Sequence, residues 1–305
     1  MSQSVQATVP VPRGGRTGAG GRARTVLLFV APALLLYGIY VLYPVVVSIW
    51  YSMLEWDGIG AGKFVGLSNW QRLIHDDGVL SSLRNTLIIL VASFAIEIPA
   101  GLCLALLVQR LGRLGVVLSS IYIVPLLMSS VAVGITWSFL FNPQFGPLYY
   151  IYNAFGQAAP GLLGSPSGAI WAVSAVVLWQ FIPLYMLLFN AGLLAIPSEL
   201  YEASSIDGAG KRHQFWLITV PLLRRTFITA SVLILTGSLV YFDLVFVMTG
   251  GGPGNSSFTL AMYVYRAAFQ DQEVGYGSAI AVLLFFISFV LSGLIVRFSR
   301  VLQGD

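Results

Sequence analysis

The class of protein is decided by two uncharged segments, which read GVVLSSIYIVPLLMSSVAVGITWSFLF at 115–141 and AIWAVSAVVLWQFIPLYMLLFNAGLL at 169–194. Both lie in a run from Leu114 to Ser198 that has no Asp, Glu, Lys, Arg or His in 85 residues. Turn-forming residues interrupt the run at 142–147 and again at 160–168. Because about 20 apolar residues cross the roughly 30 Å of bilayer hydrocarbon, the run predicts two transmembrane spans.

Apolar residues dominate the rest of the chain as well. Of its 305 residues, 57% are hydrophobic and 9% are charged, against roughly a quarter charged in an ordinary soluble domain. This composition excludes a soluble globular protein. Four further apolar segments are long enough to be spans, and they lie at Val26–Leu54, Asn85–Val108, 226–248 and Gly277–Val296. The sequence therefore predicts an all-α membrane protein with six transmembrane helices.

The N-terminal residues differ from the rest in composition. Residues 1–24 are rich in Gly, Arg and Pro and contain no apolar run, so we expect a disordered basic tail. The apolar segment after it is too long for the hydrophobic region of a cleaved signal peptide. Residues 25–305 are then expected to form one six-span domain, with a long loop at 195–225 between the fourth and fifth spans.

Several kinds of chemistry have little support in the composition. The net charge is +4, and the basic residues cluster between apolar runs, so nucleic-acid binding is not expected. Cys103 is the single cysteine, and with His75 and His213 it does not provide an ordinary zinc site. The glycines at 250–254 have no following Lys, so no phosphate-binding loop is formed. We expect no catalytic residues, no metal and no cofactor in this chain.

The positions of the basic residues predict the orientation in the membrane. Six spans place both termini on one side, and 12 of the 16 basic residues fall on that side. The 12 are Arg13, Arg16, Arg22, Arg24, Arg110, Arg113, Lys211, Arg212, Arg224, Arg225, Arg297 and Arg300. Because short loops with excess Lys and Arg stay in the cytoplasm, we expect both termini and the 195–225 loop there, in a bacterial-type cytoplasmic membrane.

The loop at 195–225 predicts a short exposed helix. Pro197 ends the fourth span, Ser198 can cap a new helix, and Glu199 in its first turn complements the helix dipole. Gly208 can adopt the left-handed backbone angles that end a helix. An ordinary interfacial linker is the alternative interpretation.

One motif in this loop resembles a known family. The order Glu202-Ala203-Ser204, three residues, Gly208, nine residues, Ile218, one residue, Val220-Pro221 resembles the EAA loop of permease subunits in ATP-binding-cassette importers. It departs from the family pattern at Ser204, at Val220 and at Arg224. The resemblance implies ATPase coupling by Glu202, Ala203, Ser204, Asp207, Gly208, Ile218 and Pro221.

The resemblance extends over the chain from about residue 25, in the carbohydrate branch that includes the maltose-type permease subunit. Further segments carry it: Leu42-Tyr43-Pro44, 64–70, 141–148, and 242–277 with Gly250-Gly251-Gly252-Pro253. It implies the MetI-like permease fold with a cytoplasmic coupling helix. It also implies a second permease subunit, an ATPase dimer that binds ATP and Mg²⁺, an extracytoplasmic sugar-binding protein, and surrounding membrane lipid.

The same resemblance implies a substrate pathway through the fourth and fifth spans. By alignment outward from the EAA loop, the positions that match sugar contacts are Phe181, Ile182, Tyr185, Ser238 and Tyr241, and we add Asp243 at the expected outer mouth. Aromatic faces and hydroxyls suit a carbohydrate, although aromatic residues in a bundle also serve packing alone. Glu97 can belong to the pathway or bond to a neighbouring helix. The loops at 55–82 and 250–257 can meet the binding protein or be plain surface.

Two classes of function compete with a sugar importer. An intramembrane serine protease needs a general base in the bundle, whereas both histidines fall in expected loops. A secondary transporter of small polar solutes would need no ATPase-docking helix. Within the importer class, glycerol phosphate esters are the alternative cargo to neutral sugars.

Overall fold

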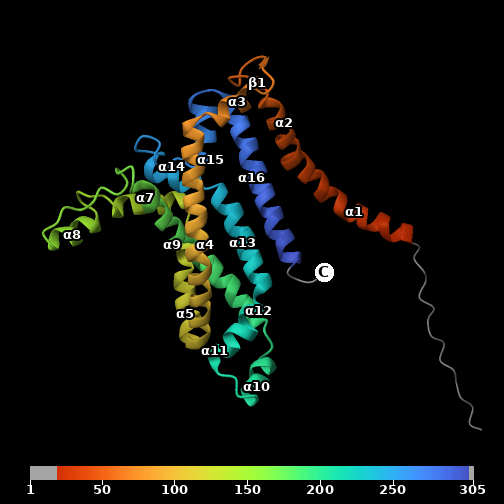
Figure 1. Cartoon of the computed structure of the whole chain (residues 1–305), viewed down its shortest axis with the longest axis vertical. Helices are drawn as coiled ribbons and strands as arrows, with labels where there is room; N and C mark the ends of the chain where they lie inside the picture. Colours follow the sequence, from red (N-terminus) through yellow and green to blue (C-terminus); the bar gives the residue numbers. More distant parts are fainter. Residues whose placement is uncertain (1–18, 302–305) are drawn as a thin grey trace, which may run out of the picture. The chain divides into compact units, whose positions relative to one another are not determined.

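A computed structural model describes the backbone of residues 19–301, with side chains from 28 to 297 (Figure 1). Its N-terminal unit, residues 1–47, contains α1 (Ala19–Tyr37), a π-helical turn η1 (Gly38–Leu42) and the start of α2 (Tyr43–Tyr51). Residues 19–24 are therefore helical in spite of two glycines, Gly20 and Gly21, which corrects the prediction of a disordered tail for them. The tail predicted for 1–18 lies outside the described residues.

The second unit begins at Ser48 and is almost entirely helical, apart from one short antiparallel pair of strands. Its elements are β1 (Leu54–Glu55), β2 (Lys63–Phe64), α3 (Ser68–Ile74), α4 (Asp77–Leu111), α5 (Arg113–Tyr122), α6 (Val124–Leu127), α7 (Ser130–Leu140), α8 (Pro147–Ala154), α9 (Ala169–Leu194), α10 (Ser198–Ile206), α11 (Lys211–Gln214), η2 (Phe215–Thr219), α12 (Val220–Leu222), α13 (Arg224–Leu239), α14 (Asp243–Thr249), α15 (Leu260–Tyr265), η3 (Arg266–Gln270) and α16 (Val274–Val301).

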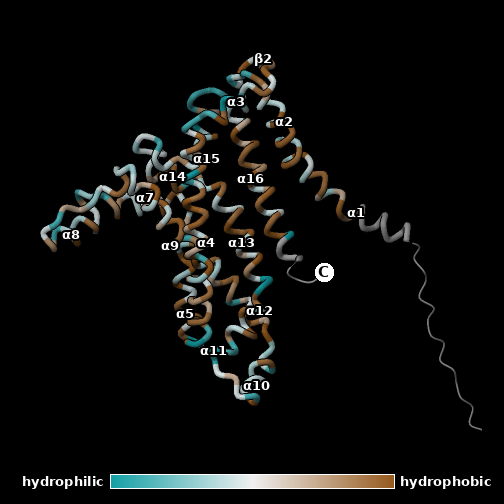
Figure 2. Tube along the Cα trace, viewed as in Figure 1, coloured by the Kyte–Doolittle hydropathy of each residue, from teal (hydrophilic) through white to brown (hydrophobic). Residues whose placement is uncertain are grey.

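The core of this unit lies between its longest helices. α4 packs along α9, and α13 packs against both α4 and α16 (Figure 1). Most of their buried side chains are aliphatic or aromatic, but α4 also buries a row of polar residues that runs from Ser82 to Glu97. In Figure 2 brown, hydrophobic segments predominate along α13 and α16, and teal segments gather near α3 and around the turn between α4 and α5.

Among the described residues, four helical segments are long and apolar enough to cross a membrane: Leu28–Tyr51, Asp77–Leu111, Ala169–Leu194 and Val274–Arg297. Two bent helix pairs pass the same test, which gives up to six spans if each pair counts as one. The chain is thus an all-α, multi-pass membrane protein, and the predicted first, second, fourth and sixth spans each correspond to one of these long segments.

The predicted third span, 115–141, is broken. Residues 113–127 and 130–140 meet at 96°, because Met128 and Ser129 adopt extended backbone angles between α6 and α7. Gln180 of α9 donates its amide to the released carbonyl of Met128 at 3.4 Å. A run of apolar residues fixes only that the segment is buried in lipid or protein, so the sequence could not predict this bend.

The predicted fifth span, 226–248, is also wrong in its boundaries. α13 ends at Leu239, and α14 begins at Asp243 after a short non-helical break. The bend of 60° lies instead at the other end of α13, where 211–222 leads into 224–239. Thr259 donates its hydroxyl to the carbonyl of Tyr241 at 2.8 Å and so stabilises the break.

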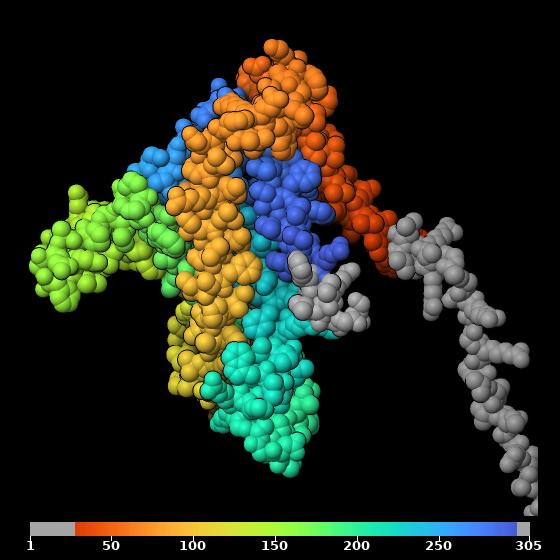
Figure 3. All heavy atoms as spheres, viewed as in Figure 1, coloured from red at the N-terminus to blue at the C-terminus, as the bar shows by residue number. Residues whose placement is uncertain are grey.

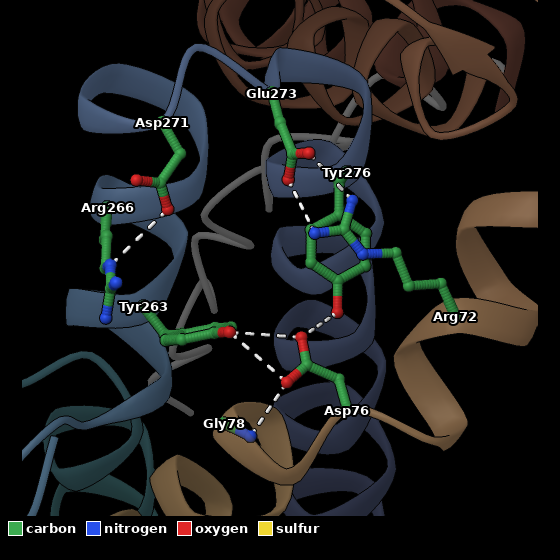
Figure 4. A network of polar contacts seen from close by, with 8 residues as sticks. All are labelled: Arg72, Asp76, Gly78, Tyr263, Arg266, Asp271, Glu273 and Tyr276. Carbon is green, nitrogen blue, oxygen red and sulfur yellow. Dashed lines mark hydrogen bonds and ion pairs between the residues drawn. The ribbon is translucent and has the colours of Figure 1, made fainter.

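A polar network ties α3 and α4 to α15 and α16 (Figure 4). Asp76, the N-cap of α4, accepts hydrogen bonds from the Gly78 amide at 2.8 Å, from the Tyr263 hydroxyl at 3.1 Å and from the Tyr276 hydroxyl. Arg72 forms an ion pair with Glu273 at 2.8 Å and lies over the Tyr276 ring. Partial burial raises the pKa of Asp76, but the bonds from Tyr276, Gly78 and Tyr263 outweigh it and hold that pKa below its usual 3.8.

We expect Asp76→Asn to lower the free energy of unfolding by about 1 kcal/mol near neutral pH, because it weakens the two tyrosine bonds but keeps the capping oxygen. The folded-state pKa is depressed, so the stabilising contribution is present above 3.8 and is lost as the pH falls through the lower folded value. Thermal unfolding in detergent should therefore separate wild type from variant near neutral pH and not in strong acid. Asp77→Asn, at the exposed neighbouring position, is the control; equal destabilisation by both changes would contradict the network.

Gly101 allows α4 to approach α9 closely. A Cβ atom there would lie 2.7 Å from the Cβ of Tyr185 and 3.0 Å from its carbonyl carbon. We expect Gly101→Ala to force the helices apart and to cost about 1–3 kcal/mol of stability, measured as a lower melting temperature. Gly237→Ala is the control, because its nearest atom, the Tyr241 hydroxyl oxygen, is 3.9 Å away. Unchanged melting of Gly101→Ala would show that the helices are less tightly packed.

Candidate functional site

The loop at 195–225 contains the predicted exposed helix, α10. Pro197 occupies its N-cap position and Ser198 is its first helical residue, so the predicted capping by Ser198 is wrong by one position. Pro197 has no side-chain oxygen, and no side-chain capping bond forms. Glu199 lies in the first turn as expected. The helix ends at Gly208, whose φ of +82° is left-handed, as its sequence position predicted.

A set of hydrogen bonds, which we call the latch, holds α10 against the segment that leads into α13. The Gln214 amide donates to the Tyr201 carbonyl at 3.1 Å and to the hydroxyls of Ser204 and Ser205 at 2.9 Å each. The hydroxyls of Tyr201 and Thr219 lie 2.9 Å apart. The sequence did not single out Gln214, Tyr201 or Thr219. Ser204 was predicted as a coupling residue and as a departure from the family pattern, and its hydroxyl also belongs to the latch.

The other face of α10 is exposed. Ile206 is 88% exposed, and Glu202, Ala203 and Asp207 are also exposed. Figure 3 shows the green-to-teal region that contains α10 standing out at one end of this unit. An exposed face that combines an isoleucine with two carboxylates is suited to contact another protein.

The structure divides the predicted coupling residues into two groups. Glu202, Ala203, Ser204, Asp207 and Gly208 lie on α10 or at its end. Ile218 lies half-buried in η2, and Pro221 lies exposed in α12. These two belong to the segment 211–222, which follows α10 in the chain and contacts it through the latch.

A second polar group, the central polar cluster, lies among the long helices. It consists of Ser93 and Glu97 of α4, Phe181 and Tyr185 of α9, and Tyr241 after α13. Glu97 is fully buried, and its Oε1 accepts a bond from the Ser93 hydroxyl at 3.3 Å. The Tyr185 hydroxyl lies close by, and Tyr241 is within electrostatic range of both groups. The rings of Phe181 and Tyr241 have centroids 5.6 Å apart.

The cluster contains hydrogen-bonding capacity that the described residues do not use. Glu97 Oε2 has no hydrogen-bond partner among them. Outside the cluster as defined, Gln180 Oε1 of α9 and the Ser238 hydroxyl of α13 are also buried without a described partner. Buried polar atoms are normally paired, so such exceptions point to a ligand, a water or a partner. A charged residue inside a span was the sequence signal for Glu97.

The remaining predicted pathway residues lie elsewhere. Ile182 is half-buried in α9. Asp243, expected late in the fifth span, is instead the exposed first residue of α14. The helix is interrupted between Leu239 and Asp243, so α14 is a separate short helix. Asp243 therefore begins α14 and does not lie inside the fifth span. The predicted sites thus come together only in part, around Phe181, Tyr185 and Tyr241.

The glycine-rich loop after α14 is held firmly to its neighbours. The Asn85 amide of α4 donates to the carbonyls of Ser256 and Phe258 at 2.9 and 3.0 Å. Arg266 donates to Asn255 at 2.8 Å. Near α3, a polar pocket of about 690 Å³ is lined in part by Trp56, Asn69 and Arg72. The glycine-rich loop is therefore held in one conformation by hydrogen bonds, and the surface near α3 contains a defined pocket.

Comparison with known proteins agrees with this geometry. The family model for the binding-protein-dependent transport system inner membrane component matches residues 97–303. A multiple sugar-binding transport system permease protein of Streptococcus mutans is 30% identical over 89% of this chain and 94% of its own length. An sn-glycerol-3-phosphate transport system permease protein of Agrobacterium fabrum is 33% identical over 89% and 93%.

A solved structure shares the fold. It is that of a bacterial alginate ABC transporter in complex with an alginate pentasaccharide-bound periplasmic protein, and its matching chain superposes with a TM-score of 0.79 at 18% identity, over 92% of this chain and 96% of that one. The family match covers more than two thirds of the sequence, and the long helices and the exposed α10 agree with it. This chain belongs to the family of binding-protein-dependent transport system inner membrane components.

Proposed function

We propose that this chain is one of two pore subunits of an ATP-driven sugar importer, and that α10 couples the pore to a partner ATPase. The observation that carries the proposal is the exposed acidic and apolar face of α10, which ends at a left-handed Gly208 and is fixed from behind by the latch. ATP and Mg²⁺ are then held by the partner, and this chain supplies the mechanical connection.

The latch provides a route for that coupling. Gln214 and Thr219, which bond to α10, both lie within the segment 211–222, which meets α13 at a bend of 60°. A displacement of α10 by the ATPase therefore moves α13 as well. α13 ends next to Tyr241, so the motion reaches the central polar cluster.

The central polar cluster is suited to a sugar. Phe181 and Tyr241 offer aromatic faces for the C–H surface of a sugar ring, and Tyr185 and Glu97 offer groups for its hydroxyls. Glycerol phosphate is the alternative cargo, which the Agrobacterium relative suggests. The cluster contains a carboxyl group and no Arg or Lys, so it favours a neutral polyol over a phosphate ester.

The proposal also includes partners and an orientation. The excess of basic residues around α10 supports a cytoplasmic location for this end and for both termini, in a bacterial-type cell. The opposite end, with the pocket beside Trp56 and the braced glycine-rich loop, then faces the extracytoplasmic sugar-binding protein. A second permease subunit completes the pore. Membership of this family argues against the secondary-transporter and intramembrane-protease alternatives.

Coupling is tested by Gly208→Asp in the assembled importer. A side chain at φ +82° costs about 1–2 kcal/mol and shifts the end of α10. We expect the variant to be inserted normally but to lose most ATP-dependent uptake in vesicles while ATP hydrolysis by the complex continues.

The matched control is Gly210→Asp, which adds the same charge two residues later, at an ordinary φ of −71° and in equally open space. It should retain most of the uptake. Equal uptake by wild type and Gly208→Asp would refute the docking role of α10.

The cargo path is tested by Tyr185→Phe and Tyr241→Phe, which keep the packing and remove one hydroxyl each. Loss of a hydrogen bond to the cargo should lower sugar uptake by about three- to tenfold while the complex still assembles. Tyr122→Phe, in α5 and outside the cluster, is the control. Normal uptake kinetics in both cluster variants would remove them from the path.

A further inference from the structure

A pocket of about 670 Å³ lies beside the latch, between the ends of α4 and α9 and the segment 211–219. Three basic side chains line it, Arg110, Lys211 and Arg212, and none of the lining residues is acidic. Within the described part of the chain, no carboxylate comes within ion-pair distance of these three cations. The pocket therefore concentrates positive charge that none of the described residues neutralises.

The depth of the pocket matches the headgroup layer of a bilayer. The apolar run of α4 ends at Val108, and its first polar residues, Gln109 and Arg110, line the pocket. α9 contributes Leu193, one residue before its own end at Leu194. The pocket thus has apolar side chains on the side of the helix interiors and cations on the side of the helix ends. Basic pockets of this kind between transmembrane helices bind lipid headgroups.

We propose that this pocket binds the phosphate of an anionic phospholipid headgroup. Arg110 and Arg212 can each present two parallel N–H donors to phosphate oxygens, and Lys211 adds a third charge. Leu106, Leu193 and Phe215 offer apolar surface to the adjoining glycerol and acyl carbons. The exposed face of α10, which carries the acidic residues, is a separate surface on the side away from the latch.

The pocket shares residues with the latch. Tyr201, Gln214 and Thr219 line it, and the same three residues hold α10 in place. A bound headgroup thus contacts the side chains that fix the coupling loop, and lipid composition acts on the rigidity of that loop. The binding itself is independent of any cargo or ATPase.

The test is lipid retention by the full chain. The chain is purified in neutral detergent, and native mass spectrometry compares added phosphatidylglycerol with phosphatidylcholine of the same acyl chains. We expect wild type to prefer phosphatidylglycerol. Lys211→Gln with Arg212→Gln should weaken that binding about thirtyfold, since each basic side chain near an anionic headgroup contributes about fivefold.

The matched control is Arg113→Gln with Arg225→Gln, which removes the same charge from two exposed residues that do not line the pocket. Arg110→Gln is a second pocket variant on a different helix, and it should also weaken binding. The proposal would be overturned if wild type retained both lipids equally, or if the pocket and control variants lost binding equally. The three cations would then be assigned to carboxylates of a protein partner. Displacement of the lipid by excess inorganic phosphate would overturn it in favour of a soluble phosphate.

Discussion

In apolar surroundings, a backbone carbonyl released at a helix break has to find another donor, and this requirement governs where the bundle can bend. The helical path bends after α6, where Gln180 donates to the carbonyl of Met128, and it is interrupted after α13, where the Thr259 hydroxyl donates to the carbonyl of Tyr241. Each donor comes from a different helix or loop. The breaks therefore exist only in the folded bundle, and they are part of its tertiary structure.

These breaks also produce the interior chemistry. The break after α13 leaves Tyr241 beside Phe181 and starts α14 at Asp243, which separates a residue of the interior from a residue of the surface. Glu97 faces this region from α4 with one oxygen unpaired among the described residues. The result is an interior with aromatic faces and spare hydrogen-bonding groups, which is the combination that a passing polyol needs and a purely structural bundle avoids.

Among the described residues, charged side chains are paired at one end of the helical unit, and several are unpaired at the other. Around α3, charges are paired within the chain, as Arg72 is with Glu273 and Arg266 with Asp271, and Asp76 accepts two tyrosine hydroxyls. Around α10, the described cations Lys211 and Arg212 have no such partner, and the acidic face of α10 is open. The charges near α3 are neutralised within the described residues, whereas those near α10 are available to other molecules.

The sequence alone determined the membrane class, the positions of four long spans and the exposed helix α10, because these depend on local properties: apolar length, Pro197 before α10 and the left-handed freedom of Gly208. Only the tertiary structure decided the bend at Met128, the start of α14 at Asp243, and the contacts of Gln214 with α10. It also brought Glu97, Tyr185 and Tyr241 together from three separate segments. Hydrophobicity along a chain specifies that a residue is buried, but its neighbour is chosen by packing between distant helices, which no local pattern encodes.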